Sequence, residues 1–204
     1  MKNIKKLLFF VLTLYSINAF SQKGSFYIGG SGGFSSRTFS KSDIKSTSWN
    51  FSPEVGTFLT DNVQVGIGVK LKGTKSINVS DFQQSKYDYT ETATGASIYG
   101  RYFFKPGSSF RPFVGLNVDI LPEKQKYDFA DNSKNIESKV FNLGANLNAG
   151  FSYAIAPRWS VLGSFATLGF NRSKPKNSDN VTTDFGLDIN TLGNRFTIGF
   201  YYSF

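Results

Sequence analysis

The sequence predicts an all-β fold: an eight-stranded antiparallel up-and-down transmembrane β-barrel, with short turns at one end and long loops at the other. Segments of alternating apolar and polar residues recur along the chain, whereas long helical periodicity is missing beyond the N-terminal segment. Short and long connections alternate strictly between these segments, as in barrels that cross a membrane. In residues 197–204 one strand face is apolar and aromatic, and the other is small and polar apart from Tyr201.

The N-terminus reads as a secretory signal peptide. Basic residues precede the apolar run 7–14, and Ala19 and Ser21 are small residues at the −3 and −1 positions before Gln22. The apolar run is too short for a membrane-spanning helix, which needs about 20 residues. We therefore expect export and cleavage between Ser21 and Gln22. The expected boundaries are 1–21 for the signal peptide and 22–204 for a single barrel domain.

The first four strands follow from the alternation. The first places Phe26 and Ile28 on one face together with glycines, and the second turns Trp49 and Phe51 outward. The third alternates most clearly, with apolar residues at every odd position from Val63. Aliphatic and aromatic residues also alternate in the fourth. The expected spans are 24–38, 49–60, 63–71 and 93–104.

The second half of the chain gives four more strands. The fifth sets Val114, Leu116 and Val118 against lipid, and the sixth alternates over its whole length. The seventh alternates less cleanly, and the last slips in phase near 190–194, where a bulge is expected. The expected spans are 110–120, 139–153, 159–170 and 184–204.

The connections fix the orientation of the barrel. Turn-forming residues such as Asp61, Pro106 and Pro157 mark the short connections. The longer connections are expected to be loops over 37–48, 72–92, 121–138 and 171–183. Aromatic residues gather near the strand ends, where interfacial girdles form in membrane barrels. The alternative is a soluble lipid-binding barrel, which would turn its apolar face inward.

The motifs in this chain resemble those of the small outer-membrane β-barrel domain family, the OmpA/OmpX-like eight-stranded barrels of Gram-negative bacteria. The resemblance rests on the signal peptide, the glycine-rich first strand and three segments: 51–56 (FSPEVG), 111–115 (RPFVG) and 197–204 (TIGFYYSF). It implies an outer-membrane location and recognition by the barrel-assembly machinery. The expected assembly signal is Thr197, Gly199, Tyr202 and Phe204. We expect a monomer.

Residue types absent from the sequence restrict the chemistry. The chain has no His and no Cys, so neither a Ser-His or Asp-His catalytic arrangement nor an imidazole or thiolate metal site can form. No phosphate-binding or dinucleotide-binding motif is found. The sequence therefore predicts a protein that is not an enzyme and has no cofactor.

The charge balance is basic. The formal net charge is +9, and signal cleavage would leave 20 basic residues against 14 acidic ones. These charges are scattered through loops rather than gathered on a helix or stripe, so no nucleic-acid partner is expected. In an outer membrane the nearer polyanion is lipopolysaccharide, whose phosphates the loop lysines would meet, and the alternative reading of each lysine is general solubility.

Four charged residues are expected to face the lumen: Glu54, Lys70, Arg101 and Asp119. Buried charges must pair, which predicts a Glu54–Arg101 or Asp119–Arg101 ion pair with Lys70 nearer the extracellular mouth. The network would either plug the lumen or gate a small conductance. Five aromatic residues in the expected loops would bind a partner or extend the strands: Phe82, Tyr87, Tyr89, Tyr127 and Phe129.

The predicted function is that of an integral outer-membrane protein with a structural or surface-interaction role. A narrow pore for small solutes is the second hypothesis, disfavoured because side chains fill the interior of an eight-stranded barrel. A soluble lipid-binding barrel is the third.

Overall fold

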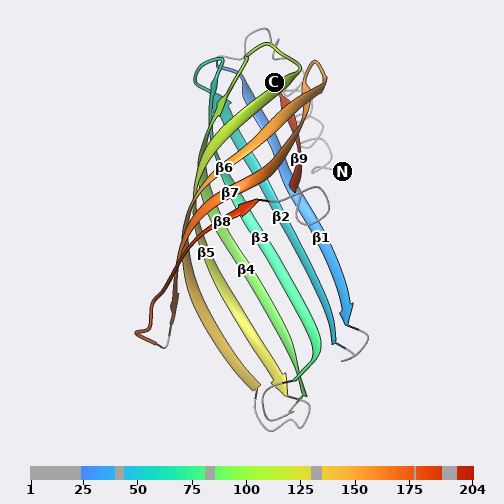
Figure 1. Cartoon of the computed structure of the whole chain (residues 1–204), viewed down its shortest axis with the longest axis vertical. Coiled ribbons are helices and arrows are strands. Elements are labelled where there is room, and N and C mark those ends of the chain that lie inside the picture. Colours follow the sequence, from blue (N-terminus) through green and yellow to red (C-terminus); the bar gives the residue numbers. More distant parts are fainter. Residues whose placement is uncertain (1–23, 40–43, 81–85, 130–134, 177, 190–196) are drawn as a thin grey trace, which may run out of the picture.

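The computed structural model describes residues 24–39, 44–80, 86–129, 135–176, 178–189 and 197–204, and most of them lie in β-strands. Nine strand segments pair antiparallel in one sheet (Figure 1). They are β1 (Phe26–Phe39), β2 (Ile44–Phe58), β3 (Val63–Ser80), β4 (Lys86–Phe103), β5 (Phe110–Phe129), β6 (Asn135–Ala156), β7 (Trp159–Pro175), β8 (Thr182–Ile189) and β9 (Thr197–Ser203). Within the described ranges, no helix has the length and apolarity to cross a membrane.

The sheet closes into a ring. Strands β1 to β7 each pair with the next, and β9 pairs with both β7 and β1. β8 pairs with β7 over Ala166–Ser173, beyond the stretch Trp159–Ser164 that pairs with β9. β8 and β9 are thus successive parts of one wall position, and the nine segments make eight strands. The predicted eight-stranded antiparallel barrel is confirmed.

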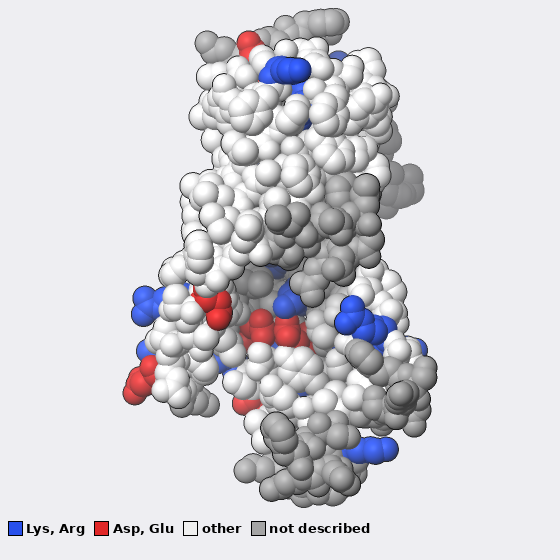
Figure 2. All heavy atoms as spheres, in the orientation of Figure 1, with Lys and Arg blue, Asp and Glu red and all other residues white. Residues whose placement is uncertain are grey.

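Side chains alternate between the two faces of the wall. In β4, Tyr99 and Phe103 are buried inside, whereas Ile98 and Tyr102 are exposed outside. Figure 2 shows a nearly uncharged outer wall in the upper half of the view, with charged residues gathered in the lower half. An outward apolar band suits lipid and is opposite to the arrangement in a soluble lipid-binding barrel.

The strands are longer than the alternation predicts. The expected loops 72–92 and 121–138 are mostly strand, because β3 continues to Ser80, β4 begins at Lys86 and β5 continues to Phe129. β2 likewise begins at Ile44. Above the lipid the outer face meets water, so its apolar residues give way to polar ones while backbone pairing continues. The expected loop boundaries there were wrong for this reason.

The irregular phase of strand seven comes from a bulge. Ala149 pairs with Ala166 and Gly150 with Ser164, which leaves Phe165 as the extra residue in β7. This extra residue returns Leu168 to the outward face. The bulge expected at 190–194 and the signal peptide at 1–21 lie outside the described residues.

Candidate functional site

The lumen is filled at the end of the barrel that carries the short turns. Every strand position around the ring contributes an inward side chain that is at most 8% exposed. We call this ring the lumen plug; its members are Tyr27, Phe58, Gln64, Tyr99, Phe113, Ser152, Leu162 and Tyr201. Phe103, fully buried, lies between Phe58 and Phe113, with ring centroids 6.0 and 5.4 Å away.

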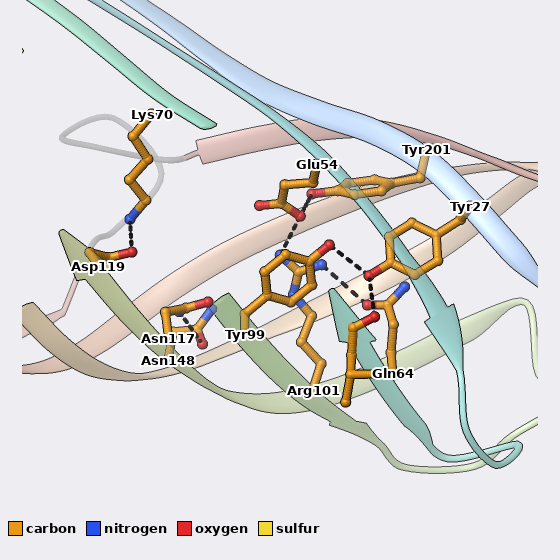
Figure 3. A network of polar contacts seen from close by, with 11 residues as sticks. Tyr27, Glu54, Gln64, Lys70, Tyr99, Arg101, Asn117, Asp119, Asn148 and Tyr201 are labelled. Atoms are coloured by element: carbon orange, nitrogen blue, oxygen red, sulfur yellow. Dashed lines mark hydrogen bonds and ion pairs between the residues drawn. The ribbon is translucent and has the colours of Figure 1, made fainter. Parts of the chain in front are cut away.

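Arg101 lies within the plug and pairs with Glu54 (Figure 3). Its Nη2 atom is 2.8 Å from Glu54 Oε2, and its Nη1 atom donates to Gln64 Oε1 at 3.2 Å. The guanidinium also lies over the Tyr99 ring, 4.2 Å from its centroid. Arg101 is 6% exposed, so a carboxylate and an aromatic face compensate for the water that its charge has lost.

Three tyrosine hydroxyls complete the polar contacts of the plug. Tyr201 donates to Glu54 Oε2 at 2.8 Å, so this oxygen accepts from both Tyr201 and Arg101. The hydroxyls of Tyr27 and Tyr99 share a hydrogen bond of 2.6 Å. The polar groups of the plug are therefore largely satisfied without water.

Each of these tyrosines is seated on a glycine directly across the strand pair. Tyr27 lies opposite Gly56, Tyr99 opposite Gly66, and Tyr201 opposite Gly29. A Cβ atom at any of the three glycines would overlap the facing tyrosine ring or hydroxyl. The small residues on the lumen face therefore supply the space into which the rings lie.

A second buried arginine lies nearer the short turns. Arg111 is 7% exposed, its guanidinium lies 5.0 Å from the Phe103 ring centroid, and its Nη2 atom donates to Ser152 Oγ at 3.5 Å. Arg111 was not among the expected lumen charges, although its position in β5 puts it on the same face as Asp119. Period-two alternation was the signal that could have found it.

Beyond the plug the lumen opens into a polar cavity of about 610 Å³, which we call the vestibule. Lys70 Nζ lies 2.6 Å from Asp119 Oδ1, and Asn146 Nδ2 donates to Asp119 Oδ2 at 3.0 Å. Lys72 forms an ion pair with Glu91. Figure 2 shows a hollow in this half of the molecule with acidic and basic residues inside it.

Aromatic side chains line the extended inner wall above the vestibule. Tyr89 lies 5.1 Å from Tyr127, and Tyr87 lies 5.4 Å from Phe129, between ring centroids. Tyr89 donates to Glu91 Oε2 at 2.7 Å. Burial and the neighbouring Glu91 carboxylate raise the pKa of Tyr89 above its ordinary value. These four aromatics extend the strands, and Phe82 lies outside the described residues.

The structure separates the four expected lumen charges into two pairs at different levels. Glu54 and Arg101 meet in the plug, while Asp119 contacts Lys70 in the vestibule rather than Arg101. Gln64, on the lumen face of β3, also contacts Arg101. No group of three or more metal-ligating side chains is found within the described part of the chain.

The terminal segment places Tyr202 and Phe204 in the outer girdle, whereas Tyr201 faces the plug. The Tyr202 ring lies 5.0 Å from Trp159 and 5.1 Å from Phe204, and its hydroxyl accepts a hydrogen bond from Arg158 at 3.1 Å. Gly199 is buried opposite Ser31 of β1, and the backbone of Thr197 pairs with Ser164 of β7.

Comparison with known proteins gives a family. Residues 7–204 match the model of the outer membrane protein beta-barrel domain. No curated protein matches.

Among solved structures, the Neisserial surface protein A (NspA) is 18% identical over 89% of this chain and 100% of its own, with a TM-score of 0.42. OprG from Pseudomonas aeruginosa is 18% identical over 90% and 97%, with a TM-score of 0.44. Ail of Yersinia pestis is 14% identical over 89% and 99%, with a TM-score of 0.36. Because the family model matches residues 7–204, nearly the whole of this chain, the chain belongs to the outer membrane protein beta-barrel domain family.

Proposed function

We propose that this outer-membrane barrel has a structural or surface-interaction role, that it is not an enzyme, and that its lumen is closed to solutes. The observation that carries the proposal is the complete ring of buried side chains in the plug. A continuous water path would have to break the Glu54–Arg101 pair or displace the tyrosines around it. Both changes would leave a buried charge without its partner, which is energetically unfavourable in a barrel interior.

The charged groups of the lumen support a role without catalysis. Glu54, Glu91 and Asp119 each lie against a cation. Glu123, which also lines the vestibule, accepts hydrogen bonds from Gln125 and Asn142, so each of these carboxylates is held by a structural partner. The interaction surface in this proposal is the vestibule together with its aromatic wall, which opens toward the cell exterior. Aromatic rings beside hydrogen-bonding side chains suit an extracellular partner.

The proposal includes the environment of the barrel. The protein would be a monomer that is assembled by the barrel-assembly machinery and contacts lipid and lipopolysaccharide. We propose no nucleic-acid partner for a barrel whose apolar wall faces the lipid of the outer membrane. Closed pairing of β1 with β9 leaves the apolar wall facing lipid, which is consistent with a single chain in the membrane.

Planar-bilayer recording tests the closed lumen against the narrow-pore hypothesis. We expect no conductance steps from the wild type or from Glu54→Ala, and a lower unfolding temperature for Glu54→Ala because Arg101 loses its partner. Asp179→Ala, at an exposed position in the connection between β7 and β8, is the matched control and should leave both measurements unchanged. Steady conductance in the wild type would contradict the plug, and conductance gained only by Glu54→Ala would identify a gate.

A second prediction concerns the assembly signal. Replacing Tyr202 and Phe204 together by alanine should lower the fraction of protein that reaches the outer membrane as a folded, heat-modifiable barrel. Phe110→Ala with Tyr153→Ala is the control, because these are also exposed aromatics near the short-turn end. Equal loss of folded barrel in both double variants would show that the girdle, and not the terminal segment, sets the yield.

A further inference from the structure

Three lysines face outward side by side across neighbouring strands. Lys124 of β5 lies directly opposite Lys139 of β6. Lys176 follows β7, and its backbone N–H donates to the carbonyl of Lys139 at 2.8 Å, which places it opposite Lys139 on the other side. Like charges directly opposite each other in a sheet repel and destabilise the pairing. A bound anion would offset the repulsion between these lysines.

Further cations surround this row. We define the basic patch as Lys124, Lys126, Lys139, Arg172, Lys174 and Lys176. Among the described residues, the acid that pairs with this patch is Glu137, whose carboxylate lies 3.0 Å from Lys124 Nζ and 3.1 Å from Lys126 Nζ. In the part of the chain that the structure describes, no ion pair within 4.0 Å joins Lys139, Lys174 or Lys176 to an acid. The patch therefore carries a strong excess of positive charge.

The patch lies at the outer edge of the apolar band. Lys174 is paired directly with Phe141, and Lys139 lies two residues beyond Phe141 along β6. Twelve residues separate Phe141 from Tyr153 near the short turns. At about 3.3 Å per residue and a tilt of about 40°, this stretch rises about 30 Å, the thickness of the hydrocarbon core. The lysines thus reach the head groups of the outer leaflet.

A groove of about 550 Å³ runs beside these lysines. Pro122 and Phe141, both exposed on the outer face, contribute apolar surface to it, and Lys139, Lys174 and Lys176 border it. Glu123 also lines the groove, but its carboxylate accepts hydrogen bonds from the vestibule residues Gln125 and Asn142. A water-soluble polyanion would engage the lysines and leave the apolar surface unused. A molecule with both phosphates and acyl chains would engage both.

We propose that this groove binds the phosphorylated, acylated glycolipid of the outer leaflet, the lipid A part of lipopolysaccharide. Its phosphates are held by Lys139, Lys174 and Lys176, and an acyl chain lies against Pro122 and Phe141. The proposal assigns residues to the lipopolysaccharide contact included in the proposed function. It is independent of the closed lumen, because the groove lies on the outer face of the wall.

The test compares two triple variants of the full barrel in phosphatidylethanolamine vesicles with and without diphosphorylated lipid A. The first replaces Lys139, Lys174 and Lys176 by glutamine. The matched control replaces Lys45, Lys75 and Lys86, three exposed lysines on β2, β3 and β4, by glutamine. Retention of lipid A by the purified barrel, unfolding temperature and heat-modifiable gel migration are measured for each.

The first variant should bind lipid A at least about tenfold more weakly than the wild type, and the control about as well as the wild type. Without lipid A, the first variant should unfold at a higher temperature than the wild type, because the repulsion between lysines is reduced. With lipid A present, the first variant should instead unfold at a lower temperature than the wild type. This reversal of sign distinguishes lost ligand binding from simple misfolding.

Competition experiments with other anions distinguish the possible sources of the bound anion. Phosphatidylglycerol, inorganic phosphate and an acidic polysaccharide should each compete poorly with diphosphorylated lipid A. Equal competition by any of them would overturn the proposal, as would equal lipid A retention by the two triple variants. Glu137→Gln should tighten lipid A binding, because it removes the acid beside Lys124 and Lys126.

Discussion

Replacing Arg101 by alanine should lower the free energy of unfolding by about 3–5 kcal/mol, the usual effect of removing one member of a buried ion pair. The variant would leave Glu54 in the plug with only the Tyr201 hydroxyl as a hydrogen-bond partner. It would also leave Gln64 and the Tyr99 ring without the guanidinium that they contact. Urea titration of the barrel in lipid vesicles, followed by tryptophan fluorescence and gel migration, measures the change.

The double variant Arg101→Met with Glu54→Leu provides the control for this interpretation. It removes both charges and keeps apolar volume in the plug, so it should be less destabilised than Arg101→Ala alone. Lys70→Ala should cost less than Arg101→Ala, because the Lys70 side chain is 33% exposed and Asp119 keeps its hydrogen bond from Asn146. If the double variant is the least stable of the three, the pair itself, and not an unpaired charge, dominates the stability.

Alternation along the strands was sufficient to place the charges inside the barrel, but not to pair them. The period of two assigns Glu54, Lys70, Arg101 and Asp119 to the lumen face. Which of them meet depends on the stagger between strands: β3 and β5, which carry Lys70 and Asp119, are each paired with β4 rather than with each other. That stagger is set by turns and bulges, so Asp119 could not be assigned to Lys70 in advance.

The full lengths of the strands and the basic patch could not be predicted from the sequence, for a related reason. In residues 72–92 and 121–138 the outward positions are mostly polar, and aromatic residues such as Tyr89 and Tyr127 face inward. Without an apolar outer face, these stretches match the pattern of loops rather than of lipid-facing strands. Once they were assigned to loops, Lys124 and its neighbours had no defined face. Only the pairing of Lys124 with Lys139 shows that the lysines form a row on the outer wall.

Replacing Gly66 by alanine should destabilise the barrel by about 1–3 kcal/mol, the range for overpacking a filled interior. A Cβ atom at Gly66 would lie 2.6 Å from Tyr99 Cζ and 2.6 Å from the carbonyl oxygen of Val55. The carbonyl belongs to a paired strand and cannot move far, so the Tyr99 ring must shift and weaken its hydrogen bond to Tyr27. The loss is measured by urea titration in vesicles.

Gly100→Ala is the matched control, because it lies one residue from Tyr99 but faces outward. A Cβ atom at Gly100 would have its nearest neighbour at 3.9 Å, the carbonyl oxygen of Gln64. Alanine fits there and reduces the freedom of the unfolded chain, so the control should be neutral or stabilising by up to about 1 kcal/mol. Adding Tyr99→Leu to Gly66→Ala should recover part of the loss if the tyrosine ring causes it. Equal effects of the two glycine substitutions would mean that strand propensity sets the stability, and that the facing glycines do not seat the tyrosines of the plug.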